Sequence, residues 1–196
     1  MLFILNLLIQ IPSFYYFSNK LKEVELGTVY NSLCHSMLVS SLSVYYLLNP
    51  QEYIYQIISN YSQVYLTLDL IAIYYFPELK KYKKIYTIHH SLCLIGYIQV
   101  CNDIYKYILC KLLLSEISVI FFDLRFISKI YNYGYLDELE NITYINFFIF
   151  RVVNITLLFC NDYTELTKIY ANYTLLPMYI LQLYWFYNMT LKMLGN

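Results

Sequence analysis

The sequence predicts an all-α, polytopic membrane helix bundle of about seven spans. Of its 196 residues, 60% are hydrophobic and only 13% are charged, whereas about 25% of the residues in an ordinary soluble domain are charged. A soluble protein of this size could not bury so much apolar sequence. The apolar runs are also continuous and too long for the alternating pattern of barrel strands. We therefore expect helices that are solvated by lipid.

Seven segments approach the roughly 20 apolar residues that a bilayer-spanning helix requires. The first is short and contains Pro12. It has no basic region before it and no small-residue cleavage site after it, so it predicts an N-terminal anchor rather than a cleaved signal. The chain has no repeat and no low-complexity linker, which predicts a single domain over 1–196. The predicted spans are 1–17, 28–48, 61–76, 85–101, 107–127, 143–160 and 170–194.

Basic residues between the predicted spans set the orientation. Nine lysines and arginines follow odd-numbered spans, including the run from Lys80 to Lys84, and three follow even-numbered spans. Because basic residues are enriched on the cytosolic side, we expect the odd-numbered connections to be cytosolic. The N-terminus is then lumenal and the C-terminus cytosolic. The connection 50–60 is predicted to be a lumenal loop that ends in the glycosylation sequon at Asn60.

Polar side chains recur at a similar depth in five of the predicted spans. Counting about 1.5 Å per residue along each helix places them in the cytosolic half of the membrane or near its middle. Because such groups are costly in hydrocarbon, we expect them to face one interior cavity. The alternative is a structural polar network that locks the helices together. The residues are His35, Asp69, His89, His90, Glu116 and Arg151, with Asn154 on the same helix face as Arg151.

The adjacent histidines His89 and His90 are the most informative of these groups. The chain has three histidines, too few for the membrane di-iron enzymes. A zinc site has enough candidate ligands, but no HExxH motif is present, and we predict no bound metal. An imidazole can instead act as nucleophile or general base in acyl transfer, with an acidic residue to orient it. The lysines at 80–84 would then suit acyl-CoA, although a positive-inside anchor explains them without any substrate.

The order of these groups resembles the TLC-domain family, polytopic membrane proteins of the endoplasmic-reticulum type that include the ceramide synthases. The resemblance covers about 29–192 and is greatest to the small, stand-alone members. It implies a six-helix core around an acyl-chain or lipid cavity, within a motif-bearing region of about 28–194. The motifs, in chain order, are Asn31…His35, Tyr65…Asp69, His89-His90, Glu116-x-Ser118…Arg125, Arg151 and Tyr184-Trp185-Phe186-Tyr187.

The same resemblance implies roles for individual residues. The paired histidines of ceramide synthases lie at the acyl-transfer centre and correspond here to His89 and His90, while the acidic position of the third span corresponds to Asp69. The next family segment reads His-Asp-x-Ser-Asp, and here it reads Ser-Glu-Ile-Ser-Val from Ser115 to Val119. If the protein is an enzyme, the catalytic residues would be His89, His90, Asp69 and Glu116. The residues expected to contact lipid are His35, Arg151, Asn154, Arg125 and Trp185.

These observations predict an integral membrane protein that binds or handles lipid or acyl chains in lipid homeostasis, in the endoplasmic reticulum or a related internal membrane. Val119, where ceramide synthases have aspartate, favours this function over an acyl-CoA-dependent acyltransferase of the ceramide synthase type. A third alternative is a non-catalytic membrane scaffold. The sequence does not decide whether the protein is an enzyme. We expect no cofactor, with acyl-CoA as the candidate co-substrate. The net charge of zero gives no case for a nucleic-acid partner.

Overall fold

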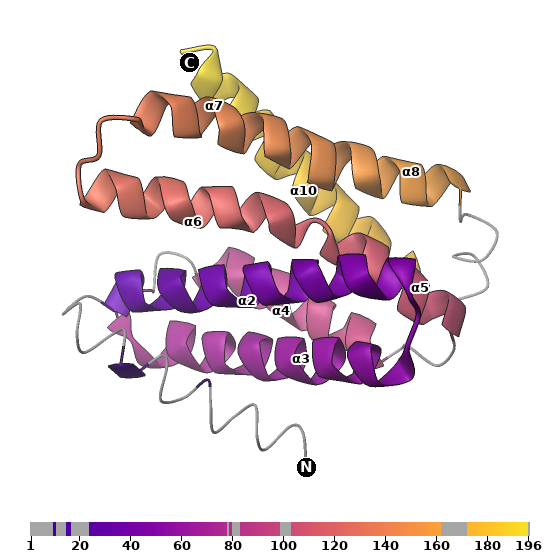
Figure 1. Ribbon diagram of the computed structural model, residues 1–196. Coiled ribbons are helices and arrows are strands. Elements are labelled where there is room, and N and C mark those ends of the chain that lie inside the picture. The colour runs from indigo at the N-terminus through magenta and orange to yellow at the C-terminus, as the bar shows by residue number, and fades with distance from the viewer. Residues whose placement is uncertain are drawn as a thin grey trace.

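The computed structural model (Figure 1) confirms the predicted all-α class for the residues that it describes, which are 10, 15–16, 24–77, 79, 83–98, 103–161 and 172–195. Strands are absent from this part of the chain. The predicted first span, Lys80 and Lys81 lie outside the described residues. The helices are α2 (Val24–Leu48), α3 (Glu52–Tyr75), α4 (Lys83–Ile98), α5 (Asp103–Leu113), α6 (Glu116–Ile130), α7 (Leu136–Phe147), the π-helical turn η2 (Phe148–Val153), α8 (Asn154–Asn161) and α10 (Asn172–Met193).

Six helical rods pack in a closed ring within the part of the chain that the structure describes. In order around the ring, α2 contacts α3, α3 contacts α4, α4 contacts α10, and α10 contacts η2 and α7. The ring closes because α7 also packs on α6, and α6 packs on α2. The short helix α5 contacts α2 and α8 at one end of the bundle, as Figure 1 shows. This arrangement agrees with the six-helix core that the resemblance implies.

The helix α3 corrects the predicted lumenal loop at 50–60. It begins at Glu52, so the connection from α2 is reduced to Asn49–Gln51 and the sequon residue Asn60 is helical. Polar residues such as Gln56 lower the apolar content of this stretch, but they lie on its exposed face. The opposite face carries Ile54 and Ile58, which are buried in an apolar cluster with Val39, Tyr46, Tyr55 and Cys110. Burial of one helix face therefore extends α3 beyond its continuous apolar run.

The predicted fifth span, 107–127, is broken into two helices. The helix α5 ends at Leu113, and α6 begins at Glu116 after a turn at Leu114 and Ser115. A helix end leaves carbonyl groups without their usual partners. The Asn154 side chain compensates here, because its Nδ2 donates a hydrogen bond of 2.9 Å to the carbonyl oxygen of Lys111 in the last turn of α5.

The continuous helix formed by α7, η2 and α8 is the one described element whose length and composition suit a membrane crossing, over Leu136–Asn161. Its apolar side chains are largely exposed on the outside of the bundle, including Ile145, Ile149 and Leu157. A bundle of about seven spans stays a prediction for the remainder of the chain.

The two ends of the ring provide a test of the predicted orientation. Pro50 lies in the exposed α2–α3 connection, and Asn132 lies in the exposed α6–α7 connection, where its φ is 54°. In a background with the native cysteines replaced, we expect Asn132→Cys to react with an impermeant thiol reagent on sealed vesicles, and Pro50→Cys to react only after permeabilisation. Labelling of Pro50→Cys alone from the cytosolic side would reverse the orientation.

Candidate functional site

His90 of α4 faces Asp69 of α3 inside the ring. Nδ1 of His90 lies 3.3 Å from Oδ2 of Asp69, and the exposed fractions of the two residues are 4% and 8%. The atoms are within ion-pairing distance but are not aligned as a hydrogen bond, so Nδ1 has no hydrogen-bond partner among the described residues. A carboxylate in this position can orient the imidazole for proton transfer with little further movement.

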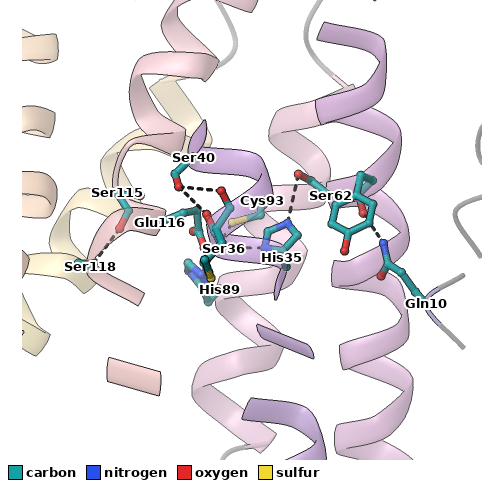
Figure 2. A network of polar contacts seen from close by, with 12 residues as sticks. Gln10, His35, Ser36, Ser40, Ser62, His89, Cys93, Ser115, Glu116 and Ser118 are labelled. Carbon is teal, nitrogen blue, oxygen red and sulfur yellow. Dashed lines mark hydrogen bonds and ion pairs between the residues drawn. The ribbon is translucent and has the colours of Figure 1, made fainter. Parts of the chain in front are cut away.

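His35 of α2 joins three helices in one polar cluster (Figure 2). Its Nε2 lies 3.3 Å from Oγ of Ser62 on α3, and its Nδ1 lies 3.9 Å from Oε2 of Glu116 on α6. Ser36 donates a hydrogen bond of 3.0 Å to the same Glu116 oxygen. The His35 ring stacks on Tyr65 with centroids 4.0 Å apart. Glu116 therefore faces His35 and Ser36, while Asp69 faces His90.

His89 points away from Asp69 toward α10. Its ring lies 5.5 Å from the Trp185 ring and 5.3 Å from the His90 ring, measured between centroids. Its Nε2 is 4.0 Å from the sulfur of Cys93, one turn further along α4. Its Nδ1 is sealed from solvent and has no partner among the described residues. Because adjacent helical residues lie about 100° apart, the two histidines of the pair have different neighbours.

Arg151 lies on the π-helical turn η2 and is 4% exposed. Its Nε donates a hydrogen bond of 2.7 Å to Oγ of Ser118 on α6, and its Nη1 donates one of 2.8 Å to Oε1 of Gln182 on α10. Its guanidinium carbon is 5.4 Å from the centre of the Phe147 ring and 5.9 Å from that of Trp185. Single π-helical turns are rare and frequently occur at functional sites.

Three of the polar contacts in this cluster come from residues that were not predicted from the sequence as part of the site. Ser36, Ser62 and Gln182 are 0%, 1% and 2% exposed. Gln182 had a signal available, because a lone amide within an apolar helix commonly forms an interhelical hydrogen bond. The two serines had no comparable signal, since this residue type is frequent in α2 and α3.

Two predicted site residues lie outside this cluster. Asn154 bonds the backbone of α5. Arg125 forms an ion pair with Glu140 of α7, with 2.6 Å between Nη2 and Oε1, and Lys192 of α10 also reaches that oxygen at 2.9 Å. This second cluster connects α6, α7 and α10 and accounts for Arg125 by contacts inside the protein.

A surface pocket lies at the C-terminal end of α2 and is lined by Tyr46, Pro50, Glu52, Asp103, Ile104 and Tyr107. Tyr46 is 11 residues beyond His35, or roughly 16 Å along the helix, so the pocket and the polar cluster are separate. The predicted interior cavity around the histidines stays a prediction. The described residues include no group of three or more histidine, cysteine or acidic side chains placed to hold a metal ion.

The polar cluster thus combines His35, Asp69, His89, His90, Glu116, Arg151 and Trp185 from α2, α3, α4, α6, η2 and α10. Comparison with protein families gives one finding on this chain: a model described as the TLC domain matches residues 24–191. No curated protein and no solved structure matches the chain.

Proposed function

Because the chain belongs to the TLC-domain family, and is thereby a membrane protein with a lipid-related function, we propose that it binds the acyl chain of a lipid at the seam between α4 and α10, beside His89 and Trp185. In this proposal it contributes to lipid homeostasis in the endoplasmic reticulum or a related internal membrane. Its N-terminus is lumenal and its C-terminus is cytosolic.

The observation that carries the proposal is a set of buried histidine nitrogen atoms that make no hydrogen bond with the described residues, although Nδ1 of His90 lies 3.3 Å from Asp69 and Nδ1 of His35 lies 3.9 Å from Glu116. Nδ1 of His35, of His89 and of His90 each lack a hydrogen-bond partner among the described residues, and each is sealed from solvent. An unsatisfied buried polar group costs about 1–3 kcal/mol, so native proteins retain few of them without a reason. A ligand headgroup that hydrogen-bonds to some of these atoms would offset that cost.

The seam between α4 and α10 also provides access from the bilayer. His89 and Trp185 are half-buried, and they meet at this seam. Neighbouring side chains on both helices, Ile88 and Tyr184, are 57% and 54% exposed, and in this proposal they contact lipid. An acyl chain could therefore approach the histidines laterally, without passing through the water-facing ends of the ring.

Trp185 makes the proposal directly testable, because it is the one tryptophan in the chain. We expect phospholipid with brominated acyl chains to quench its fluorescence saturably in purified protein, since bromine quenches an indole that it contacts. Excess unbrominated lipid should restore the signal. Native mass spectrometry of the same preparation would identify the lipid that co-purifies.

The matched control moves the tryptophan by one residue. In the double variant Trp185→Phe, Tyr184→Trp the indole faces bulk lipid, so quenching should rise in proportion to the brominated fraction and should not saturate. The proposal is wrong if Trp185 in the unmodified protein behaves in the same way as this control.

A second candidate function, acyl-CoA-dependent acyl transfer, is favoured by one specific observation. The distance of 3.3 Å between Asp69 and His90 is the pairing of acid and imidazole that general base catalysis uses.

A further inference from the structure

The buried guanidinium of Arg151 forms no direct ion pair with an acidic residue among the described residues. Its two hydrogen-bond acceptors, Ser118 and Gln182, are both neutral. The two acidic residues of the polar cluster are directed elsewhere, because the Glu116 carboxylate bonds Ser36 and faces His35, and Asp69 faces His90. A charge inside a membrane protein is normally paired or open to water. Arg151 is therefore a buried cation without a direct ion pair among the described residues, and the carboxylates of Glu116 and Asp123 attract it only from a greater distance.

The unused donors of Arg151 define what it could bind. A guanidinium has five N–H donors in a planar fork, and two of them have acceptors among the described residues. The remaining donors match the two oxygens of a carboxylate, which arginine binds in a bidentate manner. The rings of Phe147 and Trp185 lie beside the group, which is 4% exposed. Exclusion of water strengthens such a pair.

The depth of Arg151 decides between two sources of an oxyanion. It lies 15 residues after Leu136 in a helix that extends to Asn161, which is roughly 22 Å along the axis. Asn161, at the other end of the helix, is 10 residues further on, or roughly 15 Å. With the helix centred in a hydrocarbon core about 30 Å thick, Arg151 lies near the middle of that core. The phosphate of a phospholipid stays at the headgroup level. The carboxylate of a single-chain fatty acid can reach this depth.

We propose that Arg151 binds the carboxylate of a long-chain fatty acid, whose hydrocarbon chain leaves the site along the α4–α10 seam past Trp185. This inference rests on the proposed function, because it assigns a headgroup to the acyl chain that the protein binds. The pair neutralises two charges that are each unfavourable in hydrocarbon. Among acyl compounds, the protein would thus select the free acid over esters and alcohols of the same chain.

The experiment compares three ligands with the same dibrominated C18 chain: the free acid, its methyl ester and the corresponding alcohol. Quenching of Trp185 in purified, detergent-solubilised protein reports binding of each. We expect the acid to bind at least about tenfold more tightly than the ester or the alcohol, the effect of one charge-assisted hydrogen-bonded pair. Phosphatidic acid carrying the same dibrominated chains should bind more weakly than the free acid.

Two variants test the role of Arg151. Arg151→Gln should remove the preference for the acid while binding of the ester and the alcohol persists. Lys129→Gln, which removes one positive charge from an exposed position on α6, should keep the preference. If Arg151→Gln does not fold, as judged by size-exclusion chromatography, the comparison of the three ligands on the unmodified protein still decides.

The outcomes separate this inference from the proposed function. Equal saturable binding of acid, ester and alcohol would overturn the role of Arg151 and leave acyl-chain binding intact. Tighter binding of phosphatidic acid than of the free acid would overturn the assignment to a fatty-acid carboxylate. The absence of saturable quenching by any ligand would contradict the proposed function itself.

Discussion

Replacing Phe147 with alanine is expected to lower the free energy of unfolding by about 3–5 kcal/mol, the range found for phenylalanine in a packed core. Phe147 is 1% exposed and is the last residue of α7 before the π-helical turn. Its ring packs on Phe122 of α6 and on Phe186 of α10, with centroids 5.8 and 6.2 Å away. Truncation would therefore leave a cavity where three helices meet.

The same substitution should also weaken the selection of fatty acid. The guanidinium of Arg151 lies over the Phe147 ring, so loss of the ring removes one wall of the site and a favourable cation–π contact. We expect Phe147→Ala to reduce the preference for the acid over the alcohol without abolishing it, because the hydrogen bonds from Arg151 to Ser118 and Gln182 remain.

A lipid-facing residue on the same helix provides the control. Ile149 is 46% exposed, and Ile149→Ala should change stability by no more than about 0.5 kcal/mol. Chemical unfolding in mild detergent micelles, followed by far-UV circular dichroism, measures both variants under the same conditions. Equal stability of the two variants would show that Phe147 does not hold α6, α7 and α10 together.

The helical class and several helix bounds could be predicted from the sequence, because apolar runs report burial in lipid. The predicted span 28–48 corresponds to α2, and the predicted span 170–194 corresponds to α10. The start of α3 could not be predicted from a continuous apolar run. The residues at 52–60 are apolar on one face only, and their helix is stabilised by packing of Ile54 and Ile58.

The break between α5 and α6 could not be predicted from apolar content, because the stretch 107–127 is apolar enough to form one helix. The carbonyl oxygen of Lys111 at the end of α5 accepts hydrogen bonds from the backbone N–H of Leu114 and from the side chain of Asn154, 43 residues away in sequence. The π-helical turn at Arg151 has no sequence signal either. The hydrogen-bond partners of the Arg151 side chain are Ser118 on α6 and Gln182 on α10. The rotation of these two helices about their own axes depends on packing, which the sequence pattern does not show.

Counting residues along each predicted span gives the depth of the site residues in the membrane, but it does not show which side chains contact each other. Asp69 and Glu116 were equivalent candidates to orient a histidine, and the structure places Asp69 beside His90 and Glu116 beside His35. His89 lies beside neither acid. Which residues touch depends on helix rotation within the ring, and this rotation follows from the packing of all six rods together.

If the protein is an acyltransferase, substitution of either paired histidine, His89 or His90, is expected to have a large effect on the rate of acyl transfer. Transfer of an acyl group from a CoA thioester to an amine forms an amide and releases the CoA thiol. An imidazole can take the proton of the amine and pass it to the departing thiolate, or it can attack the thioester carbonyl to form an acyl-imidazole that the amine then cleaves. His90 has Asp69 to orient it, whereas His89 lies at the α4–α10 seam where an acyl chain would enter. Each histidine would therefore have its own role, and neither could replace the other.

We expect His89→Ala and His90→Ala each to abolish acyl transfer, a loss of at least about 10²-fold, with the fold intact. Pure protein is incubated with acyl-CoA and a long-chain base, and N-acylated product is measured by mass spectrometry. Ile88→Ala changes the neighbouring, lipid-facing residue of α4 and should keep the rate. Asp69→Asn should lower the rate less than His90→Ala does, because the amide oxygen can still accept a hydrogen bond while the charge is lost.

The same incubation distinguishes the two functions, because lipid binding without catalysis gives no product in the unmodified protein. In that case the histidine variants should show only a graded loss of the Trp185 quenching by brominated lipid, since each removes one polar contact of the site. Robust N-acylated product that disappears in His89→Ala or His90→Ala would replace lipid binding with acyl transfer as the function. Val119 favours the first result, because the resembling ceramide synthases have an aspartate at this position and the valine side chain has no group that could accept or donate a proton.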